Sequence, residues 1–290
     1  MQVIDGPFRA AEALDAGLLT FRELRRFYRA VFPGVWILRG VELSVVDGCR
    51  AAWLWSGRAA VVAGLSASAL LGAKWIEPDT PVELIHPNRR PPTGVVVHQG
   101  FLSPGETTMV KGLPVTSAAR TAFDLGRWLD LAEGVERIDA LMNTTDVKVV
   151  DIEAVARRHT RAKALVQLGE TLALVDGGAE SKYESKTRLL LVQNGFPPPQ
   201  TQIEVFDDNG YFVARIDMGW REYKVGVDFE GAHHWTDPKQ RSKDVERYAR
   251  LPELGWTDVR LTSGILHNNP HQFLRRASDA LIARGCPRTW

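Results

Sequence analysis

The sequence predicts a mixed α+β or α/β protein with two domains, residues 1–176 and 177–290. Two patterns indicate the mixed class. Residues 7–40 read as a helical pair followed by a strand, and the C-terminal third reads as a helix, a hairpin of two apolar strands, a second helix and a last strand. The Asp-Gly-Gly run at 176–178 is the clearest flexible joint, so we place the domain boundary there.

The composition is ordinary for a globular chain of about two domains: 290 residues, 44% hydrophobic and 24% charged. Its net charge of +1 gives no global attraction to nucleic acid, so any DNA binding must come from local basic patches. The only two cysteines, Cys49 and Cys286, are far apart, which excludes a cysteine zinc site and fits a reducing compartment. No signal peptide or membrane-spanning run is evident, so we expect a cytoplasmic protein without membrane contact.

The N-terminal segment predicts two short helices. The first ends at Gly17, and Thr20 with Glu23 forms a capping box that starts the second, over residues 21–31. The arginines of this second helix recur with the 3,4 spacing of one helical face: Arg22, Arg25, Arg26 and Arg29. Such a face either binds a nucleic-acid backbone or is a solvated surface, and the sequence leaves both readings open.

A strand over residues 34–40, GVWILRG, follows the arginine helix. This arrangement resembles the winged helix at the N-terminus of abortive-infection (type IV) antitoxins, with the arginine helix as the recognition helix. The stretches LSASALLGAKW (65–75) and LPVTSAARTAFDL (113–125) resemble the middle region of the same family. The resemblance implies a DNA-binding, antitoxin-like region.

The middle of the chain is expected to play structural roles. Residues 56–75 are alanine-rich and read as mostly helical, and residues 81–101 read as two strands around a proline-rich basic turn. A helix then starts near residue 117, with Arg120 and Asp124 spaced for an intrahelical pair. Helical patterns continue to the domain boundary. They include a basic cluster that either complements a helix dipole or lies along nucleic acid: Arg157, Arg158, His159, Arg161 and Lys163.

Carboxylates interrupt the most apolar part of the C-terminal domain. Glu184 lies on a predicted helix over residues 180–195, Asp217 on the first strand of the hairpin, and Asp228 and Glu230 on the second. Residues two apart on a strand share one face of the sheet, and the hairpin brings Asp217 to the same patch. Because clustered carboxylates repel one another, such a patch usually persists with a cation, and oxygen ligands favour Mg²⁺ or Mn²⁺.

The acidic and basic positions of this region form an ordered set: Glu184, Asp217, Asp228, Glu230, His234, Asp244, Arg247 and Arg260. The set resembles the PD-(D/E)XK nucleases, and most closely the domains similar to the very short patch repair endonuclease. The resemblance implies a restriction-endonuclease-like αβββαβ domain with a mixed central sheet. It also implies a metal-dependent DNA endonuclease of repair or defence.

The resemblance also implies roles for individual residues. Asp217, Asp228 and Glu230 would hold Mg²⁺ or Mn²⁺, and Glu184 and His234 would support the reaction. Arg247 and Arg260, together with the arginine helix, would bind DNA. A homodimer, or a repair or toxin partner, would complete the assembly.

The chain departs from the nuclease pattern at Glu230, where these enzymes usually carry lysine, and Lys224 would have to reach around to replace it. Two alternatives therefore stay open. Asp217 and Asp228 could be neutralised by Arg215, Lys224 or helix arginines in a folded but inert core. The whole chain could also be a DNA-binding, antitoxin-like transcriptional regulator that carries a catalytically inactive nuclease fold.

Overall fold

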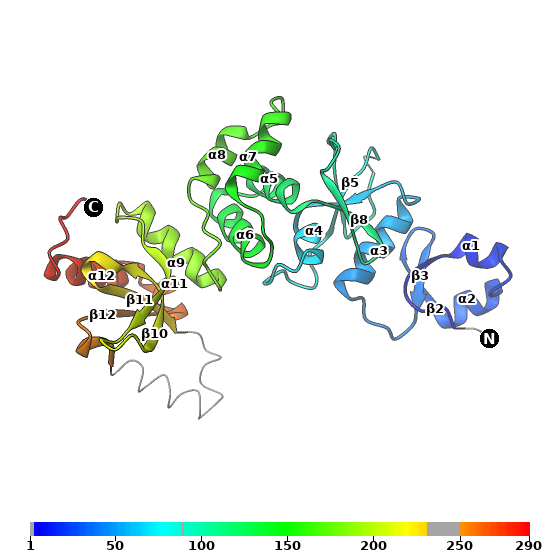
Figure 1. Cartoon of the computed structure of the whole chain (residues 1–290). Coiled ribbons are helices and arrows are strands. Elements are labelled where there is room, and N and C mark those ends of the chain that lie inside the picture. Colours follow the sequence, from blue (N-terminus) through cyan, green and yellow to red (C-terminus); the bar gives the residue numbers. More distant parts are fainter. Residues whose placement is uncertain (1–2, 89, 231–249) are drawn as a thin grey trace. The chain divides into compact units, whose positions relative to one another are not determined.

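The computed structural model describes residues 3–88, 90–230 and 250–290. It divides into two compact units, residues 1–173 and 174–290, each built from helices and sheets (Figure 1). The mixed α+β class predicted from the sequence is therefore confirmed. No helix in the described part of the chain is long and apolar enough to cross a membrane.

The first unit opens with a small helix-and-sheet segment. Its elements are β1 (Phe8–Arg9), α1 (Ala10–Asp15), α2 (Phe21–Phe27), β2 (Tyr28–Phe32) and β3 (Val35–Leu38). The three strands pair antiparallel in the order β1-β3-β2. The predicted second helix was too long, because the chain leaves the helix at Tyr28 and enters β2. Tyr28 is fully buried with Leu24 and Leu19, and this packing fixes the turn between helix and strand.

A mixed five-stranded sheet follows. Its strands are β4 (Val61–Val62), β5 (Val82–Ile85), β6 (Val95–His98), β7 (Thr107–Val110) and β8 (Leu113–Thr116), in the order β6-β5-β4-β8-β7. Helices α3 (Val45–Trp55) and α4 (Gly64–Leu70) pack on it around one apolar core. The prediction for residues 56–75 missed β4. The two strands predicted in 81–101 are present, but they pair parallel because the intervening residues return to the same end of the sheet.

Four helices complete the first unit: α5 (Ala118–Trp128), α6 (Leu131–Thr144), α7 (Val149–Arg158) and α8 (Leu165–Leu172). Helix α5 lies among the other three (Figure 1). Ser117 caps it by accepting a hydrogen bond from the backbone N–H of Arg120, and the predicted Arg120–Asp124 pair is present at 2.8 Å. The predicted helical patterns are present, but the last of them is divided into α7 and α8 by residues 159–164.

The second unit contains one mixed four-stranded sheet. Its elements are α9 (Lys182–Gln193), β9 (Gln200–Phe206), β10 (Phe212–Trp220), a 3-10 turn (Arg221–Tyr223), β11 (Val225–Glu230), β12 (Thr257–Thr262), α11 (Ser263–Asn268) and α12 (Pro270–Ala283). Residues 250–253 are also helical. The order is β12-β11-β10-β9, with β11 and β12 parallel and the other neighbours antiparallel. The predicted hairpin and last strand are confirmed.

Helix α12 supplies much of the core of this unit. Phe273, Ala277 and Leu281 recur every four residues and are fully buried, so they form one stripe along the helix. The stripe packs against apolar strand residues, including Val227 and Leu261. On β11 the predicted acidic positions Asp228 and Glu230 alternate with Val227 and Phe229. The two acidic positions therefore lie on the face of the sheet opposite Val227.

Candidate functional site

Helix α2 starts at a complete capping box, as the sequence predicts. The Thr20 side chain accepts a hydrogen bond from the backbone N–H of Glu23, and the Glu23 carboxylate accepts one from the backbone N–H of Thr20 at 2.8 Å. These bonds from Thr20 lower the pKa of Glu23. Leu24 is buried on the inner side of the helix, so its opposite face is directed to solvent. The cap therefore gives a helix of only two turns a defined start and orientation.

The outer face of α2 carries a basic and aromatic surface, which we call the α2 face: Phe21, Arg22, Arg25 and Arg26. All four side chains are exposed, and together they line a surface hollow. Phe21 is 67% exposed, and the Arg26 guanidinium lies 5.2 Å from the ring centre of Phe27. Three cations beside an exposed aromatic ring can contact phosphates and stack on bases or sugars.

Arg29 does not belong to this face, contrary to the prediction. It lies on β2, where it pairs with Ile37 of β3, and its guanidinium donates to the carbonyl of Val41 at 3.1 Å. Arg39, just beyond β3, donates to the carbonyl of Arg25 at 3.1 Å and so ties the last turn of α2 to the sheet. The two arginines thus brace the segment around the α2 face.

The predicted acidic residues of the second unit do come together around β10 and β11. The β10–β11 pairing ends at Met218 and Val227, and carboxylates replace the next backbone acceptors. The backbone N–H of Asp217 donates to Asp228 Oδ1 at 3.0 Å, and the backbone N–H of Phe229 donates to Asp217 Oδ2 at 2.8 Å. The two aspartates therefore close the end of the ladder reciprocally, and Asp228 is only 2% exposed.

Glu184 approaches this pair from α9. Its carboxylate accepts hydrogen bonds from the backbone N–H of Glu180 at 2.9 Å and from the Gln202 side chain at 3.1 Å. Burial, followed by the negative charge of Asp217, raises the pKa of Glu184 to about 7. A carboxyl group of this kind can hold or release a proton near neutral pH.

Glu230 and Arg260 form the rim of the same cluster. Arg260 donates to Glu230 Oε1 and to Asp258 Oδ2, each at 3.0 Å, so its charge is shared between two carboxylates. Burial raises the pKa of Asp258. Asp258 was missed from the sequence, although its position two residues before Arg260 on a predicted strand placed it on the same face.

Two basic residues that were expected to neutralise the aspartates also make contacts elsewhere. Arg215 pairs with Glu180 at 2.8 Å, and Lys224 donates to the carbonyl of Leu254 at 3.0 Å. Neutralisation of Asp217 and Asp228 by Arg215, Lys224 or the helix arginines stays a prediction. Lys224 is likewise engaged away from Glu230, so it does not replace the lysine of the nuclease pattern.

Several donor atoms of this cluster are engaged by protein groups. Asp217 Oδ2 and Asp228 Oδ1 accept backbone hydrogen bonds, and Glu230 is paired with Arg260. Within residues 3–88, 90–230 and 250–290, no three His, Cys, Asp or Glu side chains are grouped so that they could hold a metal ion. The predicted Mg²⁺ or Mn²⁺ site therefore stays a prediction. His234, Asp244 and Arg247 lie outside the described residues.

The first unit contains a second charged cluster, centred on Arg120. This side chain is 2% exposed and binds Glu106 at 2.7 Å as well as Asp124, while His159 Nε2 lies 2.9 Å from Glu106. Burial alone would raise the pKa of Glu106, but hydrogen bonds from Arg120 and His159 lower it. Arg158 also reaches Glu106, at 3.2 Å. Two members of the predicted basic cluster therefore bind an internal carboxylate, which indicates a structural role for them.

Among known protein families, one family model matches the middle of the chain. Residues 59–174 match the family model of the AbiEi antitoxin C-terminal domain. This range includes both middle stretches on which the antitoxin resemblance rests, so the antitoxin-like part of the prediction is supported. It ends before residue 177, and it gives no support to the nuclease resemblance of the second unit.

Relatives in Mycobacterium tuberculosis are similar over a longer range. The uncharacterized proteins MT2308 and Rv2248 are each 28% identical over 192 residues, covering 66% of this chain and 70% of their own length. The crystal structure of the RV2827C protein from the same organism aligns with 67% of this chain and 76% of its own, at 18% identity. Its TM-score of 0.37 is too low for the fold to be carried over. The matched antitoxin domain is therefore the similarity that bears on function.

Proposed function

We propose that this protein is a DNA-binding regulator of the antitoxin type, in which α2 is the recognition helix. The observation that carries the proposal is the α2 face, where three exposed arginines and Phe21 project from a capped helix. The match of residues 59–174 to an antitoxin domain supports the same reading and adds a toxin as a second partner class.

The topology around α2 is compatible with this role. Along the chain, α1 and α2 lie between β1 and β2, and β2 and β3 form a hairpin. This is the order of elements expected of a winged helix. The major groove of B-DNA is about 12 Å wide and admits one α-helix. The arginines of α2 would contact phosphates and guanine edges there, and the β2–β3 hairpin would lie over the adjacent backbone.

Binding to duplex DNA tests this proposal. Replacing Arg22, Arg25 and Arg26 with alanine should weaken binding to the DNA upstream of the protein's own coding sequence by at least about 100-fold. The dependence of log K on log salt should also become less steep by up to about 3, because three phosphate contacts are lost. Fluorescence anisotropy in EDTA at several salt concentrations measures both quantities.

The matched control removes the same charge elsewhere, by replacing Arg157, Arg161 and Lys163 with alanine. This variant should keep most of the affinity. An equal loss in both triple variants would show a diffuse electrostatic attraction and would refute recognition by α2. Unchanged binding in the α2 variant would do so as well.

Metal-dependent DNA cleavage remains a second candidate, favoured by the convergence of Glu184, Asp217 and Asp228 around a mixed sheet. Its test is the cleavage of labelled single-stranded, duplex, mismatched and branched DNA with Mg²⁺, Mn²⁺ or EDTA. Products that need a metal and disappear in Asp228→Ala would establish a nuclease. DNA that is bound in EDTA and never cut would favour the regulator, because binding then occurs without chemistry.

A further inference from the structure

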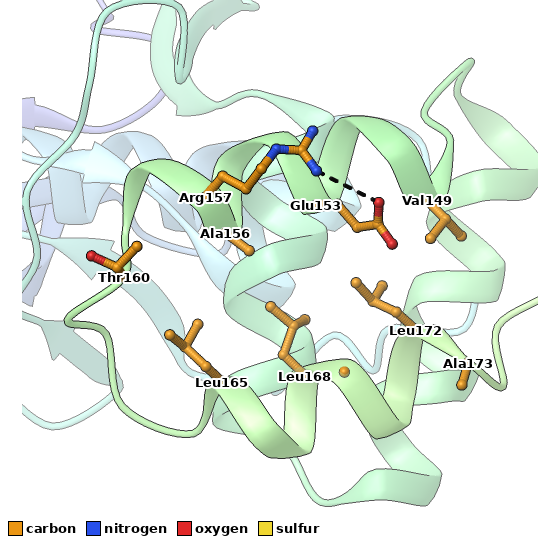
Figure 2. A pocket seen from close by; sticks show the side chains of 10 residues that line it. Val149, Glu153, Ala156, Arg157, Thr160, Leu165, Leu168, Leu172 and Ala173 are labelled. Atoms are coloured by element: carbon orange, nitrogen blue, oxygen red, sulfur yellow. Dashed lines mark ion pairs between the residues drawn. The ribbon is translucent and has the colours of Figure 1, made fainter.

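Helices α7 and α8 border an open groove of about 810 Å³ (Figure 2). Its lining residues recur at helical spacing on both sides: Val149, Glu153, Ala156 and Arg157 from α7, and Leu165, Leu168, Gly169 and Leu172 from α8, with Thr160 and Ala173 at the ends. Positions three, four and seven apart form one face of a helix. Each helix therefore turns one stripe toward the same groove.

The floor of the groove is apolar and has room for side chains. Leu168 is buried at the bottom, while Leu165 and Leu172 are partly exposed along one wall. A Cβ added at Gly169 would meet nothing within 4 Å, so open space lies directly above the helix backbone. Small residues at Gly169 and Ala156 allow the ridges of a third helix to enter between α7 and α8.

Charge is unevenly distributed around this floor. Thr160 and Leu165 both line the groove, so the connection between them, which carries Arg161 and Lys163, bounds that end. Among the ion pairs of the described residues, neither Arg161 nor Lys163 takes part, and both are exposed. Arg157 adds a third cation on the wall, where Glu153 pairs with it only at 3.8 Å.

These features define the chemistry of the occupant. We propose that the α7–α8 groove binds an amphipathic helix of a partner protein, with acidic side chains in the turn that faces Arg157, Arg161 and Lys163. Nucleic acid is disfavoured because the floor offers apolar surface rather than hydrogen-bond donors. From Val149 to Arg157 the α7 stripe spans roughly 12 Å, which matches about two turns of a bound helix. The site is separate from the α2 face and does not depend on DNA binding.

A designed peptide tests the proposal. The probe is a fluorescein-labelled helical 14-mer with leucines at i, i+3, i+4 and i+7 and glutamates in its first turn. One matched peptide carries lysines in place of the glutamates, and another has the leucines scrambled. The acidic peptide should bind the full chain saturably, at least about tenfold more tightly than either control. Anisotropy titrations in moderate salt measure the three affinities.

Two variants connect binding to the groove. Gly169→Leu fills the open space and should weaken the acidic peptide at least about tenfold, whereas Glu170→Leu adds the same side chain next to the groove and should not. The double variant Arg161→Glu with Lys163→Glu should reverse the preference toward the basic peptide. Circular dichroism melts verify that each variant is folded.

Several outcomes would overturn this assignment. They are an acidic peptide that fails to saturate, equal binding of all three peptides, and a Gly169→Leu variant that binds like the wild type. Sedimentation analysis tests whether a second copy of this chain occupies the groove instead. A wild-type dimer that Gly169→Leu converts to a monomer would show that a second copy of this chain fills the groove, and the partner-helix proposal would be wrong.

Discussion

Glu184 shows how a single buried carboxyl group can set the pH response of the second unit. The side chain is 6% exposed, and its neighbour Asp217 is also acidic. Both effects favour the neutral form, which keeps the pKa near 7 although an ordinary glutamate titrates near 4.5. In the unfolded chain the group regains its ordinary pKa, so the folded and unfolded states bind different numbers of protons between these values.

Between pH 4.5 and about 7 the folded state holds the proton that the unfolded state has released, so the free energy of unfolding falls as the pH rises. The full effect amounts to about 3 kcal/mol. Glu184→Gln should remove most of this slope. Pulse proteolysis in urea and EDTA at pH 5 to 8, with fragments of residues 174–290 identified by mass spectrometry, measures it.

The exposed Glu222 provides the control for this experiment. Glu222→Gln should leave the pH dependence of the second unit unchanged, because no buried carboxyl group is removed. If Glu184→Gln keeps the wild-type slope, Glu184 does not hold the proton and this assignment is wrong.

At the scale of single residues, the sequence located the acidic positions but not their contacts. Spacing along strands placed Asp217, Asp228 and Glu230 in one patch, and the structure brings them there. The sequence could not show that two of these carboxylates accept backbone hydrogen bonds. Such bonds depend on where the strand ladder ends, and that point is set by packing rather than by residue type.

At the scale of elements, the contact between β10 and β11 depends on two facing glycines. Gly219 pairs with Gly226, and a side chain at Gly219 would overlap the carbonyl oxygen of Val225 on the neighbouring strand. At Gly226 a Cβ would lie 2.8 Å from the Ile216 side chain. The two strands can therefore approach each other closely beside the carboxylate cluster only because both positions lack a side chain.

Gly219→Ala should accordingly disrupt the β10–β11 pairing. The overlap involves backbone atoms that cannot move aside, so we expect a loss of at least about 2 kcal/mol in the stability of the second unit. Hydrogen–deuterium exchange of the β10 and β11 amides should accelerate. Gly264→Ala on α11 is the control, since its nearest neighbour would be 3.8 Å away and alanine favours the helix. Wild-type protection in Gly219→Ala would contradict the close approach.

The boundary of α2 illustrates the limit of sequence patterns for elements. The run from Phe21 to Val31 keeps helical spacing and good helix formers, so the sequence predicts one continuous helix. In the structure, Tyr28 to Phe32 pair with β3 instead, and Tyr28 is fully buried. Strand pairing and burial outweigh local helix propensity, which differs by less than about 1 kcal/mol per residue.

At the scale of the whole molecule, the two units carry different kinds of candidate site. The first contains the α2 face and the α7–α8 groove, and it includes the matched antitoxin domain. The second contains the carboxylate cluster on a mixed sheet. A protein whose first unit binds both DNA and a partner helix would not need catalysis to act as a regulator. The cleavage and binding experiments above distinguish these possibilities.

The sequence by itself determined the mixed class, the capped start of α2, the hairpin with its acidic residues and the antitoxin-like middle of the chain. These features follow from local spacing, capping residues and motifs, which a single chain carries in order. Tertiary structure alone decided that Arg29 leaves the α2 face, that β5 and β6 run parallel, that Asp258 joins the acidic cluster and that α7 and α8 enclose an open groove. Each of these depends on residues brought together by packing, and no local pattern encodes that proximity.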